Sequence, residues 1–220
     1  MTIGFFLVDT QTLESMCGYK CADALVKSAK KVMPNVSVVH FTNDTSPAVS
    51  GTSTQRMDNQ PMAKLRMRHH CNVTGDWLFV DTDVLFQQDV RPVFDKEFEL
   101  AVTSREWDHL KPAAGFAERM PVNMGVVFSR SSAFWAECLA RVKELPKPQQ
   151  NWMGDQEVFC EILAEDRYKV RQLKGAIYNF PPALDDNDQS RELEANASIV
   201  HFKGEQRKPM MLRRIGSTIP

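Results

Sequence analysis

Two carboxylates separated by one residue stand inside the apolar segment Leu78–Phe86. The residues Leu78–Val80 are apolar and β-prone, so they predict a buried strand that ends at Asp81 and Asp83. An extended backbone would direct both carboxylates to one side and Thr82 to the other. Carboxylates this close repel each other unless a cation or a proton lies between them, and hard oxygen ligands suit Mn²⁺ or Mg²⁺. The pattern indicates a metal site, with a turn capped by one Asp as the alternative.

Three further groups of polar residues could take part in chemistry. Asn123 and Gly125 interrupt an apolar strand, where a glycine marks either a close approach to a ligand or a bulge. Asp155 and Gln156 stand at the expected start of a helix, where Asp155 could equally be the N-cap. His201 ends the last apolar strand, so it is either a structural histidine or a third ligand, because Mn²⁺ accepts two carboxylates and an imidazole.

Alternating strand and helix patterns must position these groups. We expect strands over Ile3–Val8, Val36–Phe41, Leu78–Val80, Leu100–Val102, Val122–Phe128 and Ile199–Phe202, helices over Cys21–Met33, Met62–Cys71 and Ala133–Leu145, and a loop over Ser46–Met57. Such alternation predicts an α/β fold with a mainly parallel central sheet flanked by helices. A chain of 220 residues accommodates one such domain, which we place at residues 1–210, with a basic C-terminal tail at 211–220.

Composition limits the class of protein. With 27 basic and 28 acidic side chains, the formal net charge is −1, which argues weakly against a nucleic-acid-binding protein. The five cysteines are odd in number and mostly far apart, so neither a disulfide framework nor a zinc site is favoured. No stretch has the features of a signal peptide or a transmembrane segment. We therefore expect a cytoplasmic protein with reduced thiols.

The order of motifs resembles the GT-A glycosyltransferases of family 8, which include bacterial lipopolysaccharide galactosyltransferases and glycogenin. The motifs are Asp81-Thr82-Asp83, Asn123-Met124-Gly125-Val126, Asp155-Gln156, Asn179-Phe180-Pro181-Pro182 and His201-Phe202-Lys203-Gly204 followed by Lys208-Pro209. The resemblance covers most of the chain. It implies a single GT-A domain that transfers a sugar from a nucleotide-diphosphate sugar, with a UDP-sugar as the expected donor and with retention at the anomeric carbon.

The resemblance also implies roles for individual residues. Asp81, Asp83 and His201 would hold Mn²⁺ or Mg²⁺, and Lys208 would grip the diphosphate. Lys64 would contact phosphate or sugar, Asn123 and Asp155 would hold the donor sugar, and Gln156 would lie beside the anomeric carbon. The remaining expected substrate-binding positions are Val8, Asp9, Thr10, Thr82, Gly125 and Gly204.

Two departures from the family pattern concern the donor. Met210 stands where the family usually has Trp after Lys-Pro, and the loop from Gly204 to Lys208 is one residue longer. The first strand lacks the aromatic residue that often stacks on uracil, and the acceptor stays open among glycan, lipopolysaccharide, nucleic acid and protein. Arg213 and Arg214 make the C-terminus basic, which suits either an anionic acceptor or an ordinary solvated tail.

Two other functions are compatible with parts of this sequence. The run Phe79–Asp83 is similar to the first motif of haloacid-dehalogenase phosphatases, although that motif usually lies near the N-terminus and continues with Gly-Thr. A non-catalytic sugar-nucleotide binding protein is the second alternative, because fold and motifs do not guarantee activity.

Overall fold

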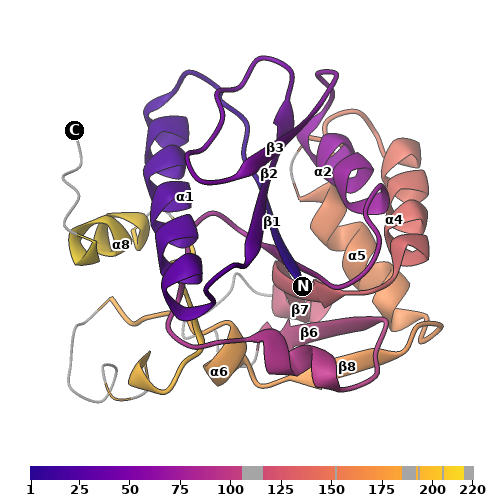
Figure 1. Ribbon diagram of the computed structural model, residues 1–220. Coiled ribbons are helices and arrows are strands. Elements are labelled where there is room, and N and C mark those ends of the chain that lie inside the picture. Colours follow the sequence, from indigo (N-terminus) through magenta and orange to yellow (C-terminus); the bar gives the residue numbers. More distant parts are fainter. Residues whose placement is uncertain (106–115, 152, 185–191, 193, 205, 216–220) are drawn as a thin grey trace.

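The computed structural model describes residues 1–105, 116–151, 153–184, 192, 194–204 and 206–215. Its centre is a seven-stranded sheet in the order β3-β2-β1-β4-β7-β6-β8 (Figure 1). The strands are β1 (Thr2–Phe6), β2 (Ser37–Asn43), β3 (Ser53–Met57), β4 (Trp77–Val80), β6 (Leu100–Ser104), β7 (Val122–Ser129) and β8 (Val170–Leu173). Strand β7 is antiparallel to both of its neighbours, and all the other pairs are parallel. The expected mainly parallel α/β sheet is confirmed.

Helices cover both faces of this sheet. They are α1 (Leu13–Val32), α2 (Met62–Cys71), α3 (Phe116–Arg119), α4 (Ser132–Glu144), α5 (Gly154–Ala164), α6 (Gly175–Tyr178) and α8 (Lys208–Arg214), with a 3₁₀ turn at Arg91–Asp95. Helix α1 lies on one face, and α2, α4 and α5 pack together on the other (Figure 1). Strands covered on both faces need apolar residues throughout, which explains the continuous apolar runs in the sequence.

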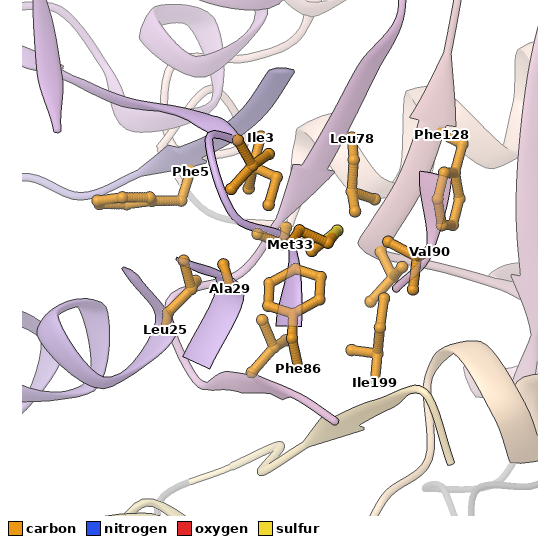
Figure 2. Packing of buried hydrophobic residues seen from close by; sticks show 14 of the residues in the cluster. Ile3, Phe5, Leu25, Ala29, Met33, Leu78, Phe86, Val90, Phe128 and Ile199 are labelled. Atoms are coloured by element: carbon orange, nitrogen blue, oxygen red, sulfur yellow. The ribbon is translucent and has the colours of Figure 1, made fainter. Parts of the chain in front are cut away.

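The core between α1 and the sheet shows how the strand alternation is used. Ile3 and Phe5 of β1 point toward Leu25 and Ala29 of α1, whereas Phe6 belongs to the cluster on the opposite face. Figure 2 shows this packing, together with Phe86 of the same cluster. These side chains are fully or almost fully buried, so they anchor the strand ends that carry the polar groups.

A second, two-stranded sheet brings distant segments together. Strand β5 (Val84–Phe86) pairs antiparallel with β9 (Ile199–His201), and Val84 lies opposite His201. The backbone N–H of Phe202 donates to the Asp83 carbonyl at 2.8 Å. The end of the last strand is therefore fastened directly to the acidic turn.

Three expectations about local structure were wrong. Ser53–Met57 is not loop but the edge strand β3, whose exposed side chains need no apolar pattern. Helix α1 begins at Leu13, before the expected Cys21. The backbone does not continue extended through Thr82 and Asp83 but turns there, because β5 leaves the main sheet to pair with β9.

The C-terminal segment is packed on the domain as far as the structure describes it. The boundary expected at residue 210 falls inside α8, and Met211 and Leu212 are fully buried beside Cys21 and Ala24 of α1. Residues 216–220 lie outside the described part of the chain. Within the described part, no helix combines the length and apolar character needed to cross a membrane.

Candidate active site

Asp81, Asp83 and His201 converge, although His201 lies 118 residues after Asp83 in the sequence. The His201 Nε2 atom lies 3.1 Å from Asp83 Oδ1 and 3.6 Å from Asp81 Oδ2. Asp83 and His201 are buried, whereas Asp81 is partly exposed. One ligand atom from each of the three lies within 4.8 Å of the others. Two carboxylates and an imidazole at this spacing match the ligand preference of a divalent cation.

The surrounding charges keep the buried carboxylate ionised. Burial would raise the pKa of Asp83, but His201 in its protonated form, with a charge and a hydrogen bond from Nε2, and the charge of Lys208 hold that pKa below its ordinary value. A metal ion would take the place of the Nε2 proton. An ionised carboxylate is the form that binds a metal ion. Asp83 is therefore ready to act as a ligand at neutral pH.

Because Gly125 has no side chain, there is room for the three candidate ligands to approach one another. Its backbone carbonyl accepts a hydrogen bond from the Asp81 N–H at 2.9 Å, which joins the end of β4 to β7. A Cβ atom at this position would lie 2.4 Å from His201 Cε1 and 2.5 Å from Asp81 Oδ2. Those distances are too short for any real contact, so a side chain here would displace a candidate metal ligand.

We expect Gly125→Ala to lower the affinity for Mn²⁺ by about tenfold to a hundredfold, the range typical of changes around metal ligands. Titration calorimetry on the purified variant measures this loss. Gly4→Ala is the matched control, because its Cβ would lie 2.5 Å from Phe41 Cε2 in the apolar core, away from the ligands. The control should lose about 1–3 kcal/mol of stability and keep its metal affinity. Equal metal affinity in the two variants would contradict the assignment.

A pocket of about 510 Å³ opens beside the three ligands. Of the residues expected to bind substrate or to act in catalysis, it is lined by Val8, Thr10, Thr82, Asn123, Asp155, Gln156 and Lys208, and Asp81 forms part of its wall. The pocket is large enough for a substantial part of a sugar nucleotide. The structure therefore brings most of the expected site residues together.

Four of the expected substrate-binding residues do not line this pocket. Asp9 stands between the lining residues Val8 and Thr10, and its carboxylate accepts a hydrogen bond from the Gln11 N–H. Gly125 lies behind the wall, against Asp81 and His201. Gly204 has a φ of +79°, a left-handed conformation that favours glycine, and it directs the chain from β9 toward Lys208. Lys64 is on α2 but is not among the lining residues.

Arg66, and not Lys64, is among the α2 residues that line this pocket. Its Nη1 atom lies 3.1 Å from Asp155 Oδ2, and its guanidinium stacks over the Phe6 ring. Met62, Ala63 and Arg66 all line the pocket, and Arg66 lies four residues after Met62 and three after Ala63, which places it on the same face of the helix as both. That spacing is the signal in the sequence that could have identified Arg66.

The side-chain amide of Gln156 fastens α5 to β7. Its Oε1 atom accepts from the Met124 N–H at 2.9 Å, and its Nε2 donates to the Val122 carbonyl at 3.1 Å. Those bonds fix the direction of the amide at the pocket wall. Asp155 is not the N-cap of α5, because that position is taken by Met153, which has a φ of +67°.

The fold and the site together define a class. A GT-A sheet with an Asp-Xaa-Asp turn at the end of a central strand, a histidine from the last strand and an adjoining pocket is the arrangement of a sugar-nucleotide transferase. Residues 22–212 match the model of the nucleotide-diphospho-sugar transferase family. The chain belongs to this family and is a glycosyltransferase, similar to those of family 8.

Solved structures share this fold over nearly the whole chain. The galactosyltransferase LgtC, in complex with donor and acceptor sugar analogs, matches with a TM-score of 0.63 and 14% identity, covering 100% of this chain and 98% of that one. GlyE of Streptococcus pneumoniae TIGR4 matches with a TM-score of 0.63 and 15% identity over 94% of this chain and 55% of its own. A glycosyltransferase involved in glycosylation of the major capsid of PBCV-1 matches with a TM-score of 0.56 and 13% identity, covering 96% and 99%. No curated protein sequence matches the chain.

Proposed function

We propose that this glycosyltransferase moves a hexosyl group, with retention, from a UDP-sugar to an acceptor that carries a free hydroxyl. Asp81, Asp83 and His201 would hold Mn²⁺, or Mg²⁺ in its place. The observation that carries the proposal is the convergence of these three ligands beside a pocket that also contains Lys208 and Arg66. The donor set fits a divalent cation, and the space left by Gly125 lies against two of its members.

The chemistry follows from where charge develops. Cleavage of the bond between sugar and phosphate builds negative charge on the leaving diphosphate, and a divalent cation in the site would neutralise part of it. Lys208 lines the same pocket, where its positive charge would lie beside the diphosphate oxygens. Such a donor stabilises the transition state more than the ground state, because the charge is larger there.

We assign the two ends of the pocket to the two ends of the donor. Val8 and Thr10 lie where the nucleoside would bind, and Arg66, Asn123 and Asp155 lie where the sugar would bind. The pair of Arg66 with Asp155 offers both a donor and an acceptor for sugar hydroxyls. Gln156 stands beside them, at the position proposed for the anomeric carbon.

We keep the cytoplasm as the proposed compartment on the basis of the cysteine pattern.

Donor hydrolysis tests this proposal without knowledge of the acceptor. The protein is incubated with a panel of nucleotide sugars and Mn²⁺, with Mg²⁺, or with a chelator, and released nucleoside diphosphate is measured. Slow metal-dependent release from one or more UDP-sugars is the expected result. Release of phosphate from phosphomonoesters would instead support the phosphatase alternative, which the family membership does not favour. Tight binding without any release would indicate a non-catalytic binding protein.

A further inference from the structure

We propose that Asn179 is a positioning residue that holds His201 with its proton on Nδ1 and ties the metal ligands to the sugar end of the pocket. The inference rests on the proposed metal site. Asn179 precedes Phe180-Pro181-Pro182 in the loop after α6, and its side chain reaches three polar groups from three other segments. It does not line the donor pocket, so its effect is exerted through its neighbours.

A backbone amide sets the direction of every hydrogen bond in this network. The Gly125 N–H can only donate, and it donates to Asn123 Oδ1 at 3.0 Å. The same oxygen lies 3.1 Å from one side-chain atom of Asn179, which must therefore be the donor Nδ2. The other side-chain atom of Asn179 is then the acceptor Oδ1.

That acceptor determines where His201 carries its proton. Asn179 Oδ1 lies 2.8 Å from His201 Nδ1, so Nδ1 must donate and must hold a hydrogen. In the neutral imidazole, Nε2 is then left with its lone pair, and Nε2 is the atom that faces Asp83 Oδ1 and Asp81 Oδ2. A metal ion requires that lone pair. The opposite tautomer would instead direct a hydrogen at the carboxylates.

Asn179 is held tightly enough to impose this choice. Its side chain is almost wholly buried, with 2% exposure, and its Nδ2 also donates to Thr103 Oγ1 at 2.7 Å. Its backbone N–H donates to the Gly175 carbonyl at 2.9 Å, and the His201 N–H donates to the neighbouring Phe180 carbonyl at 2.8 Å. A buried amide with these partners cannot rotate without leaving polar groups unpaired.

Three variants separate the two functions of the amide. Asn179→Leu removes both the acceptor for His201 and the donor for Asn123, and Mn²⁺ affinity should fall about tenfold to a hundredfold in calorimetry. Asn179→Asp keeps the acceptor, so Mn²⁺ affinity should stay within about threefold of wild type while affinity for a UDP-sugar falls. Thr103→Val is the control, because it removes only the third partner and should leave Mn²⁺ affinity nearly unchanged.

Nuclear magnetic resonance provides a readout that needs no metal. In metal-free protein labelled with ¹⁵N-histidine, Nδ1 of His201 should carry a proton at neutral and alkaline pH in the wild type and lose its protection from exchange in Asn179→Leu. A wild-type Nδ1 without a proton would overturn the proposal, as would equal losses of Mn²⁺ affinity in the Leu and Asp variants. Failure of the wild type to bind any divalent cation would instead refute the proposed function, whatever the imidazole signals show.

Discussion

Replacing Asp83 by asparagine should abolish metal-dependent donor binding and lower the rate of donor hydrolysis by at least about a hundredfold, because the metal ion that would stabilise the leaving group loses a charged ligand. Asp83 is buried, with Oδ1 3.1 Å from His201 Nε2, so no water-exposed group can take its place. The amide has the same shape and also removes a carboxylate that Asp81 repels. We therefore expect the variant to fold and to unfold at a temperature close to that of the wild type.

The matched control for this variant is Asp89→Asn. Asp89 lies just beyond β5 and pairs with Arg91 at the surface, away from the three ligands. Its replacement should leave donor hydrolysis and Mn²⁺ binding unchanged. Calorimetry of UDP binding with and without Mn²⁺ makes the comparison, and a metal-dependent signal that survives in Asp83→Asn would refute the assignment of this ligand.

Replacing Lys208 by alanine should reduce turnover by about a hundredfold, while the affinity for the intact donor falls much less. The diphosphate gains charge as the bond to the sugar breaks, so a cation beside it matters most in the transition state. Lys208 lies in the pocket wall at the start of α8, and the helix is anchored by the buried Met211 and Leu212. The backbone that carries Lys208 is therefore held in place by the core.

Arg213→Ala is the control for Lys208, since Arg213 is an exposed cation on the same helix and does not line the pocket. Its loss should change neither turnover nor donor affinity. Steady-state hydrolysis of the preferred donor and calorimetry with the same donor separate the two quantities. If Lys208→Ala lowers both by the same factor, the lysine contributes to ground-state binding only.

Hydrophobic patterns in the sequence were sufficient to predict the inner strands and several of the helices of this fold. Helix α2 was placed at its observed bounds, and strands β1, β2, β4, β6 and β7 were predicted, because a strand covered on both faces must be apolar throughout. Edge strand β8 was not predicted, since most of its side chains are at least partly exposed. Edge strand β3 was not predicted from the sequence, since its side chains are mostly exposed and its pairing with β2 depends only on the backbone. The Asp-Xaa-Asp turn stood out because acidic residues directly after a buried strand are not explained by packing.

The tertiary structure decided which distant segments come into contact. His201 lies against Asp83, 118 residues away, only because β9 pairs with β5 in a register that sets Val84 opposite it. Arg66, rather than Lys64, faces Asp155 because the turn of α2 directs it there. The hydrogen bonds of Asn179 and Gln156 join loops, strands and helices across the domain. Periodicity reports whether a side chain is buried, but the partner of a polar group depends on how separate elements pack, and that is determined by the folded chain as a whole.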